Sequence, residues 1–338
     1  MKAYQIVAGQ GIDNLRQVER PLRDPQPHEI LVRVRAVSLN FRDLMVARGD
    51  YLVSAGAALV PGSDAAGEVI AIGSAVKRYK VGDRVMSIFF PNWLEGAPTP
   101  EKTAVAPGGN ADGVLATHAF FDEQAAVRIP AHLDFNEAAT LTCAGVTAWN
   151  SLFVEAKVQA GDTVLLLGTG GVSIWGLQLA KAAGLRTIIT SSSDAKLERA
   201  RALGASETIN YKKFPEWDKE VLKLTAGLGV NMTIEVGGAG TLAHSVASTK
   251  MGGTIAIVGG VSGFSTEFQP FALIGGARRL SGIYVGSRQM FENMTVLIEL
   301  TKIRPVVDRV FEFDQAAAAY RHLDSGQHFG KVVISAGE

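Results

Sequence analysis

Hydrophobic and polar residues alternate with a period of two in the first part of the chain. Over residues 29–39 the apolar positions Ile30, Val32 and Val34 alternate with more polar neighbours, and this pattern predicts a half-buried strand. A short helical stretch follows over residues 40–49. Through residue 121 further strand patterns are separated by glycines, without helices between them. The first part of the chain is therefore predicted to be β-rich.

From residue 160 the pattern changes to short apolar runs that alternate with helical spacing. The first run covers residues 163–167, and after a glycine turn Val172, Trp175 and Leu179 recur at helical spacing. The alternation continues to a strand expected over residues 280–285. Repeated βα units predict an α/β fold, with a doubly wound, mostly parallel sheet that binds its ligand at the carboxyl ends of the strands.

The length of 338 residues suggests two domains of ordinary size. The last helices and strands, from residue 290 onward, are expected to return to the β-rich domain. The sequence therefore predicts one domain made of residues 1–121 and 290–338, and a second made of residues 122–289.

Composition narrows the classes of ligand and compartment. Lys and Arg together number 33, as do Asp and Glu, and the absence of a long basic run argues against nucleic acid as a ligand. No apolar run reaches the roughly 18 residues of a membrane span, so no membrane association is expected. The first residues lack the pattern of a secretory signal, and the single Cys143 excludes an internal disulfide. We expect a cytoplasmic protein.

A glycine-rich turn joins the first parallel strand to its helix. Gly168 suits the tight turn, and Gly170 lets the backbone approach a pyrophosphate that faces the N-terminus of the following helix. The third glycine of the G-x-G-x-x-G pattern is replaced by Ser173, a residue small enough for close packing of helix on strand. The turn predicts a dinucleotide-binding βαβ unit.

The end of the second parallel strand bears on the choice of dinucleotide. An NAD site usually has an acidic residue about 20 positions after the glycines, whereas this chain has Ser191, Ser192 and Ser193. Hydroxyl groups suit a 2′-phosphate and favour NADPH. Ser193 or Asp194 is alternatively only the N-cap of the next helix.

Several motifs in a shared order resemble one family. They are AVSLNFRDLMVARGDY, VPGSDAAGEVIAIG, VGDRV, AGVTAW, AGDTVLLLGTGGV and FGKVVI. Together they resemble the medium-chain dehydrogenase/reductase superfamily, in its zinc-independent, quinone-oxidoreductase-like branch. The resemblance covers nearly the whole chain and implies a Rossmann domain with a β-rich GroES-like catalytic domain.

The same resemblance implies that no metal is bound. Zinc-dependent relatives carry a Cys, a His-Glu pair and a second Cys where this chain has Asn40, Ser63-Asp64 and Cys143. These residues make an incomplete ligand set for tetrahedral zinc. The four cysteines of the family's structural zinc lobe are also missing.

The implied function is transfer of a hydride from NADPH to a small electrophile, either a quinone or an α,β-unsaturated carbonyl. An alcohol dehydrogenase or carbonyl reductase of the same superfamily is an enzymatic alternative. A nicotinamide-binding module without turnover is an alternative of another class. The resemblance further implies a homodimer, with the strand over residues 280–285 as a possible edge contact.

Candidate catalytic residues follow from the resemblance, each with a structural alternative. Asn40 is placed to donate to a substrate carbonyl, but Asn at a helix start is often a cap. Asp43 is expected to hold Asn40 or nearby backbone. Tyr51 is expected at the mouth of the site, unless it only packs. Thr147 is expected to face the nicotinamide, unless it bonds its own helix.

Candidate cofactor-binding residues lie in the glycine turn, at the following strand ends and near the C-terminus. They are Gly168, Thr169, Gly170, Gly171, Val172, Ser191, Ser192, Ser193, Lys196, Tyr211, Gly237, Val258, Gly259, Gly260, Tyr284, Val285, Gly330 and Lys331.

Overall fold

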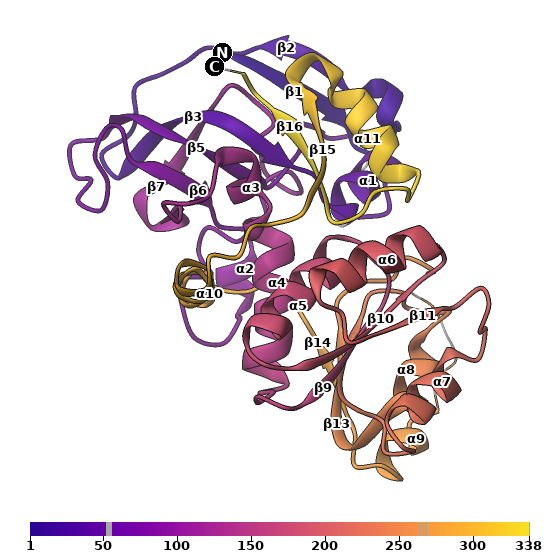
Figure 1. Ribbon diagram of the computed structural model, residues 1–338. Helices are drawn as coiled ribbons and strands as arrows, with labels where there is room; N and C mark the ends of the chain where they lie inside the picture. The colour runs from indigo at the N-terminus through magenta and orange to yellow at the C-terminus, as the bar shows by residue number, and fades with distance from the viewer. Residues whose placement is uncertain (52–55, 264, 266, 268, 338) are drawn as a thin grey trace. The chain divides into compact units, whose positions relative to one another are not determined.

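The computed structural model describes residues 1–51, 56–263, 265, 267 and 269–337. It divides into two compact units. Unit 1 comprises Met1–Val146 and Gly286–Glu338, and unit 2 comprises Thr147–Val285. The two-domain α/β architecture expected from the sequence is confirmed, with a doubly wound parallel sheet in one unit and a β-rich fold in the other (Figure 1).

Unit 1 is built on a sheet with the strand order β15-β16-β3-β5-β6-β8, and β7 also pairs with β3. A smaller sheet has the order β2-β1-β4. The strands of unit 1 are β1 (Lys2–Val7), β2 (Arg16–Glu19), β3 (Glu29–Ser38), β4 (Ala58–Leu59), β5 (Asp64–Ile72), β6 (Arg84–Ser87), β7 (His118–Asp122), β8 (Ala126–Arg128), β15 (Val307–Glu312) and β16 (Lys331–Ser335).

Short helices cover this sheet. The helices of unit 1 are η1 (Ile12–Asn14), α1 (Phe41–Arg48), α2 (Pro100–Thr103), η2 (Glu123–Ala125), α3 (Phe135–Ala139), η3 (Leu141–Gly145), α10 (Arg288–Thr301), η5 (Phe313–Gln315) and α11 (Ala316–Asp324). The largest apolar cluster joins residues from both ends of the chain, including Val37, Leu44, Tyr320 and Val332. The C-terminal segment thus completes the core of the first domain, as expected.

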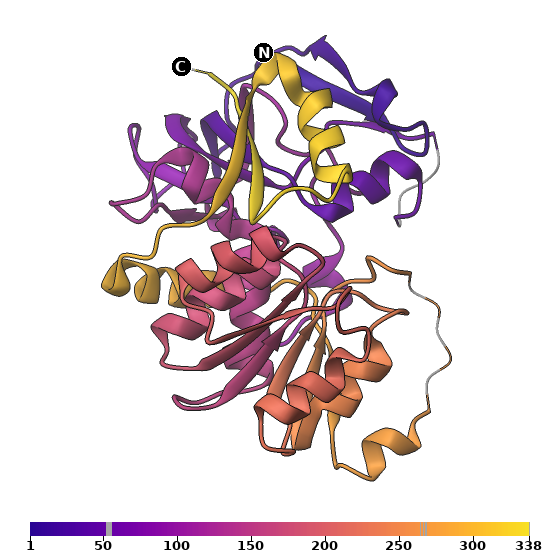
Figure 2. The ribbon, with the colours of Figure 1, turned by 45° about the vertical axis from the view of Figure 1, so that its right-hand side comes forward.

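Unit 2 is a six-stranded parallel sheet with the order β11-β10-β9-β12-β13-β14. Figures 1 and 2 show α5 and α6 on one face of this sheet and α7 and α8 on the other. The strands are β9 (Thr163–Leu166), β10 (Arg186–Ser191), β11 (Glu207–Asn210), β12 (Val230–Glu235), β13 (Thr249–Ile257) and β14 (Arg279–Gly282). The helices are η4 (Asn150–Glu155), α5 (Gly171–Ala182), α6 (Asp194–Leu203), α7 (Trp217–Leu224), α8 (Leu242–Ser248) and α9 (Phe271–Ile274), and α4 (Val146–Trp149) begins at the end of unit 1.

The strand expected over residues 280–285 is shorter in the structure, where β14 ends at Gly282. Val285 has a φ of 56°, a backbone conformation that no strand residue adopts and that is unusual for a β-branched side chain. The chain therefore leaves the sheet before Val285.

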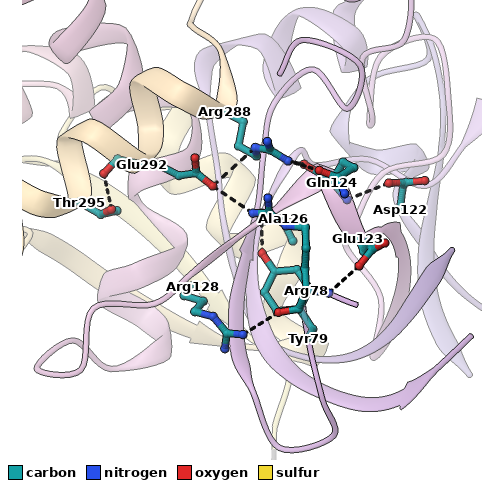
Figure 3. A network of polar contacts seen from close by, with 10 residues as sticks. All are labelled: Arg78, Tyr79, Asp122, Glu123, Gln124, Ala126, Arg128, Arg288, Glu292 and Thr295. Atoms are coloured by element: carbon teal, nitrogen blue, oxygen red, sulfur yellow. Dashed lines mark hydrogen bonds and ion pairs between the residues drawn. The ribbon is translucent and has the colours of Figure 1, made fainter. Parts of the chain in front are cut away.

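The unit boundaries also differ from the expected positions after residues 121 and 289. The strand β8 pairs with β6, so the chain is still part of unit 1 beyond residue 122. The backbone N–H of Arg288 donates to the carbonyl of Trp93 over 3.0 Å, and the Arg288 guanidinium donates to Gln124 (Figure 3). These bonds attach α10 to unit 1 from its first residue.

Among the residues that the structure describes, none of the helices combines the length and the apolar character needed to cross a membrane.

Candidate functional site

Three adjacent strands of unit 1 each have one terminus at the same place, where their polar residues come together. In the antiparallel pairing of β16 with β3, Val333 lies opposite Ser38, and the N–H of Leu39 donates to the carbonyl of Val332 over 2.9 Å. Continuing this register places Lys331 beside Asn40. On the other side of β3, Ser38 lies opposite Asp64 of β5. Residues far apart in the chain thus meet at one end of these three strands.

Asn40 and Lys331 form a buried contact there. Their exposed fractions are 8% and 4%. The Lys331 ammonium donates to the side-chain oxygen Oδ1 of Asn40 over 2.5 Å and also to the backbone carbonyl of Leu39. On its other side, Asn40 Nδ2 donates to the hydroxyl of Ser63 over 3.4 Å. Asn40 is also the N-cap of α1, where it forms a capping box with Asp43. Its side-chain amide therefore contacts other side chains and also belongs to the helix cap.

The hydrogen bonds continue from Ser63 to Cys143. The Ser63 hydroxyl donates to Asp64 Oδ1 over 2.6 Å, and the backbone N–H of Cys143 donates to Asp64 Oδ2 over 3.0 Å. Ser63 and Asp64 are fully buried. We refer to Asn40, Ser63, Asp64, Cys143 and Lys331 as the Asn40 network. It includes the positions at which zinc-dependent relatives carry their zinc ligands.

Asp43 holds the backbone at the start of α1. One of its carboxylate oxygens accepts the Asn40 backbone N–H over 2.8 Å, as expected for a residue that positions Asn40. The other oxygen lies 3.6 Å from the Arg42 guanidinium. Burial raises the pKa of the Asp43 carboxyl, although the charge of Arg42 opposes the shift. Asp43 is therefore a supporting group for Asn40.

Arg42 is a buried cation that the sequence did not single out. Its guanidinium donates to the carbonyl of Pro107 over 2.7 Å and lies over the ring of Phe89, 4.7 Å from the centroid. The ring centroid of Tyr51 lies 5.8 Å from the same group, and Tyr51 packs against the core of unit 1. Tyr51 borders residues 52–55, which lie outside the described residues. The sequence signal for a buried Arg42 was its place beside Asp43 at the start of a helix.

The Asn40 network does not fit a catalytic metal ion. Desolvation, together with the nearby Asp64 charge, raises the pKa of the Cys143 thiol to about 12, whereas a metal needs the thiolate. Both Asp64 oxygens already accept hydrogen bonds. Within the described part of the chain, His, Cys, Asp and Glu side chains form no group of three or more that could hold a metal ion.

The glycine turn of unit 2 has the form that a pyrophosphate site requires. Gly168 has a φ of 71°, which favours glycine, and its N–H donates to the Thr190 hydroxyl over 3.1 Å. Gly170 is the N-cap of α5, and no described side chain caps this helix. The helix N-terminus is thus available to bind an anion. Thr169, Gly171 and Val172 lie in the turn and the first residues of α5.

Ser173 occupies the place of the third glycine. It is 1% exposed, and its hydroxyl donates to the Leu167 carbonyl at the end of β9 over 2.6 Å. The serine thus ties α5 to the strand that precedes it. The expectation that a small residue can serve this packing position agrees with the geometry.

The serines after β10 have mixed roles. The Ser193 hydroxyl accepts the Lys196 backbone N–H over 3.4 Å and caps α6, so the capping alternative describes this residue. The Ser191 hydroxyl is buried and accepts the Ser193 N–H, while Ser192 is partly exposed. Tyr211 follows β11, its N–H bonded to the Ser191 carbonyl over 3.1 Å. These residues and Lys196 therefore meet at neighbouring strand ends.

A buried carboxylate that the sequence did not reveal organises the next turn. Glu235 is fully buried at the end of β12. It accepts hydrogen bonds from the N–H groups of Gly237 and Gly238 over 2.7 and 3.0 Å, from the Thr241 hydroxyl over 2.6 Å and from Ser245. Its position two residues before the first glycine of a pair was the signal that the sequence offered.

The second glycine pair packs against the first. A Cβ added to Gly238 would lie 2.7 Å from the Cα of Gly260, so the two turns require glycine at this approach. Val258 and Gly259 donate their N–H groups to the Glu235 carbonyl. We use "carboxyl edge" for residues 168–172, 191–196, 235–241 and 258–263 of unit 2, which all lie at the carboxyl ends of its parallel strands.

The remaining candidates occupy separate places. Val285 is buried and its carbonyl accepts the Asn150 side-chain N–H over 2.9 Å, whereas Tyr284 is 45% exposed. Thr147 is buried in unit 2, and its carbonyl accepts the Ser151 hydroxyl. Gly330, in unit 1, has a φ of 84°, and an added Cβ would lie 2.4 Å from the carbonyl oxygen of Val306. Glycine is thus required at residue 330 by local packing.

Comparisons with known proteins agree with this architecture. Residues 26–131 match the alcohol dehydrogenase GroES-like domain, and residues 171–299 match the zinc-binding dehydrogenase family. The chain belongs to the medium-chain dehydrogenase/reductase superfamily of oxidoreductases. It is 45% identical over 333 residues to a zinc-type alcohol dehydrogenase-like protein of Schizosaccharomyces pombe, with 96% of each chain covered.

Solved structures of the same fold carry different activities in their names. An NAD-dependent alcohol dehydrogenase is 32% identical, with a TM-score of 0.90 and 100% of each chain covered. A Pseudomonas syringae quinone oxidoreductase is 27% identical, with a TM-score of 0.82 and 99% of each chain covered. A mycobacterial protein complexed with NADPH is 26% identical, with a TM-score of 0.83 and 99% of each chain covered. The superfamily is shown, and the names of these neighbours include one NAD-dependent enzyme and one protein complexed with NADPH.

Proposed function

We propose that the protein is a zinc-independent, NADPH-dependent reductase of quinones or α,β-unsaturated carbonyl compounds. The observation that carries this proposal is the Asn40 network. At the positions where zinc-dependent relatives have metal ligands, this chain has residues that are hydrogen-bonded to one another and to Lys331, Cys143 through its backbone N–H. A site of this kind offers hydrogen-bond donors to a substrate oxygen and offers no Lewis acid.

The proposed reaction is transfer of a hydride to an electron-poor carbon of the acceptor. When bound, the reduced nicotinamide supplies a hydride, which forms a C–H bond at the electron-poor carbon of the acceptor while the nicotinamide is oxidised. In unit 1, the Asn40 amide donates to the acceptor oxygen as negative charge develops there. Tyr51 is the second candidate donor to that oxygen. Solvent then supplies the proton that completes the reduction.

The carboxyl edge supports a nicotinamide dinucleotide and favours NADPH. The uncapped N-terminus of α5 suits a pyrophosphate. The end of β10 carries serines in place of the acid that NAD sites use for the ribose hydroxyl. Lys196 and Tyr211 supply a cation and a hydroxyl near this strand end. The capping role of Ser193 leaves Ser192, Lys196 and Tyr211 as the main candidates for the 2′-phosphate.

An alcohol dehydrogenase activity is the second candidate function, because the name appears both for a relative of similar sequence and for a similar solved structure. Such an enzyme would remove a hydride from an alcohol, and this step usually needs a Lewis acid or a base on the hydroxyl. The raised pKa of the Cys143 thiol and the engaged Asp64 carboxylate weigh against it here.

One set of assays separates these possibilities. We expect steady NADPH oxidation with at least one quinone or enone, slower oxidation of NADH, and no loss of activity after chelation. One zinc per chain that is lost together with activity on chelation would overturn the zinc-independent proposal. Binding of NADPH without turnover on quinones, enones and aldehydes would instead favour the non-catalytic module.

We also propose that two copies of the chain associate. In the six-stranded sheet β14 stands at one end of the strand order, with β13 as its neighbour, and an edge strand presents backbone groups for pairing. The N–H of Ile283 donates to Ile257 of β13, so the N–H of the neighbouring Gly282 faces the open edge. Analytical ultracentrifugation of the wild type and of Gly282→Pro tests this. A dimer that dissociates in the variant supports pairing through β14, and a monomeric wild type contradicts it.

A further inference from the structure

From Lys331 to Asp64 the hydrogen bonds of the Asn40 network run in one direction because of the groups at these two ends. An ammonium has donors only, and a carboxylate has acceptors only. Lys331 therefore requires the oxygen of the Asn40 amide on its side, and Asp64 requires the Ser63 hydroxyl as a donor. Between them, Asn40 Nδ2 donates to Ser63. The amide has one allowed orientation.

This orientation determines what Asn40 presents to a ligand. An asparagine amide has a donor end and an acceptor end of nearly equal shape, and a flip by half a turn exchanges them. The NH2 group carries two hydrogens, and the bond to Ser63 uses one. The second N–H is left for a substrate oxygen, whereas a flipped amide would present an oxygen that repels the developing negative charge.

We propose that Lys331 is a positioning residue that holds the Asn40 amide with its NH2 group as donor to the substrate oxygen. The proposal rests on the proposed function for its catalytic consequence. The geometry that supports it is the Lys331–Asn40 contact of 2.5 Å, the burial of both residues and the bond from the ammonium to the Leu39 carbonyl, which fixes the side chain. The ammonium charge also polarises the amide and strengthens its N–H as a donor.

This role differs from the cofactor contact that the sequence predicted for Lys331. A lysine that binds a cofactor phosphate contributes to the affinity for NADPH. A lysine that orients Asn40 contributes to the rate of hydride transfer and acts only while the amide is present. A cofactor contact therefore predicts that loss of Lys331 weakens NADPH binding, whereas the positioning role predicts that it slows hydride transfer.

Kinetics of Lys331→Met, Asn40→Ala and the double variant separate the roles. We expect Lys331→Met to lower kcat about 10- to 100-fold, with the dissociation constant for NADPH within about twofold of the wild type. The double variant should be no slower than Asn40→Ala, because both substitutions remove the same donor. Lys331→Gln, which keeps a donor of shorter reach, should fall between the wild type and Lys331→Met.

Lys102→Met is the matched control. Lys102 also donates to two acceptors, the carbonyls of Glu95 and Ala97 over 2.8 and 3.1 Å, but it lies outside the Asn40 network. Its replacement should leave kcat unchanged. A rise of tenfold or more in the NADPH dissociation constant of Lys331→Met with unchanged kcat would overturn the proposal, as would additive losses in the double variant.

A measurement without turnover keeps the proposal testable if the proposed function fails. The ¹⁵N side-chain amide signals of Asn40, assigned by their absence in Asn40→Ala, report the environment of both N–H groups. We expect Lys331→Met and Lys331→Gln to shift these signals and speed their hydrogen exchange. Unchanged Asn40 signals in a folded variant contradict the positioning role, whether or not the wild type reduces quinones. If Lys331→Met does not fold, the comparison is made with Lys331→Gln.

Discussion

The Asn40 network and the carboxyl edge hold polar groups in opposite ways. In the Asn40 network side chains bond to side chains from Lys331 to Asp64, and these two charged residues set the direction of the donors between them. At the carboxyl edge one carboxylate, Glu235, gathers backbone N–H groups and hydroxyls of the adjoining turn, while the N-terminus of α5 has no described side-chain cap. The comparison teaches that unit 1 orients a few specific donors, whereas unit 2 shapes backbone for an extended anionic ligand.

Removal of Glu235 is expected to have the largest effect on the carboxyl edge. Glu235→Ala leaves the partly buried N–H groups of Gly237 and Gly238 and two hydroxyls without their acceptor. Loss of a buried, hydrogen-bonded charge of this kind costs about 3–5 kcal/mol of unfolding free energy. Urea unfolding followed by tryptophan fluorescence measures it, since Trp175 and Trp217 lie in unit 2.

Glu207→Ala is the control for that experiment, because Glu207 belongs to the same sheet but forms a partly exposed ion pair with Arg186 over 3.3 Å. Its loss should cost less than about 1 kcal/mol. Equal losses in the two variants would show that Glu235 does not organise the turn.

Reactivity of Cys143 tests how closed the Asn40 network is. The residue is partly exposed, so access alone predicts alkylation. Its pKa is about 12 instead of 9.0, which lowers the thiolate fraction about a thousandfold at pH 8. We expect iodoacetamide to label native protein about a thousandfold more slowly than urea-unfolded protein, with a native rate that still rises tenfold per pH unit above pH 9.

Cys143 is the single cysteine, so mass spectrometry of the intact chain reports this one site. A native rate that levels off above pH 9, as for a free thiol, would refute the closed network. The direction of the Cys143 pKa shift also determines how the thiol contributes to stability at different pH values. Because the folded pKa is above the unfolded one, the thiol favours the folded state below pH 9 and loses this contribution as the pH rises from 9 toward 12.

Cofactor discrimination sharpens the account of the carboxyl edge. If Lys196 pairs with the 2′-phosphate, Lys196→Ala should raise the KM for NADPH about tenfold and leave that for NADH unchanged, because a single exposed charge pair on a ligand contributes about 1 kcal/mol. Steady-state kinetics with both cofactors measures this. Lys181→Ala, at the opposite end of α5, is the control. Equal losses with both cofactors would remove Lys196 from the phosphate site.

The two regions also differ in how far the sequence predicted them. The glycine turn was predictable because its features are local: Gly168, Gly170 and Ser173 lie within a few residues of the strand and helix that they join. The Asn40 network was predicted only as separate positions. The bond between Asn40 and Lys331 spans 291 residues of sequence and depends on the register of β16 with β3, which no local pattern encodes.

Boundaries failed for a related reason. The expected end of the first domain at residue 121 relied on a change of periodicity, but β8 continues the unit 1 sheet after that change by pairing with β6. Glu235 was missed because a carboxylate at the end of a strand is usually exposed, and only the folded turn shows that its hydrogen-bond partners bury it. A periodic pattern does not reveal contacts between side chains that are far apart in the sequence.

The smallest expected effect comes from a third kind of polar contact, at the surface of unit 1. Glu292 of α10 lies 3.0 Å from Arg78 and 3.5 Å from Arg288 (Figure 3), and its side chain is 42% exposed. Solvent screens such pairs, so Glu292→Gln should lower the unfolding free energy by only about 0.5 kcal/mol. The loss should shrink further at high salt, because salt screens exposed charges. Urea unfolding at low and high salt measures both. A loss above about 2 kcal/mol would mean that α10 is held to unit 1 mainly by these charges rather than by its backbone bonds to Trp93 and Leu94. A loss that salt does not change would mean that it does not come from the exposed ion pairs.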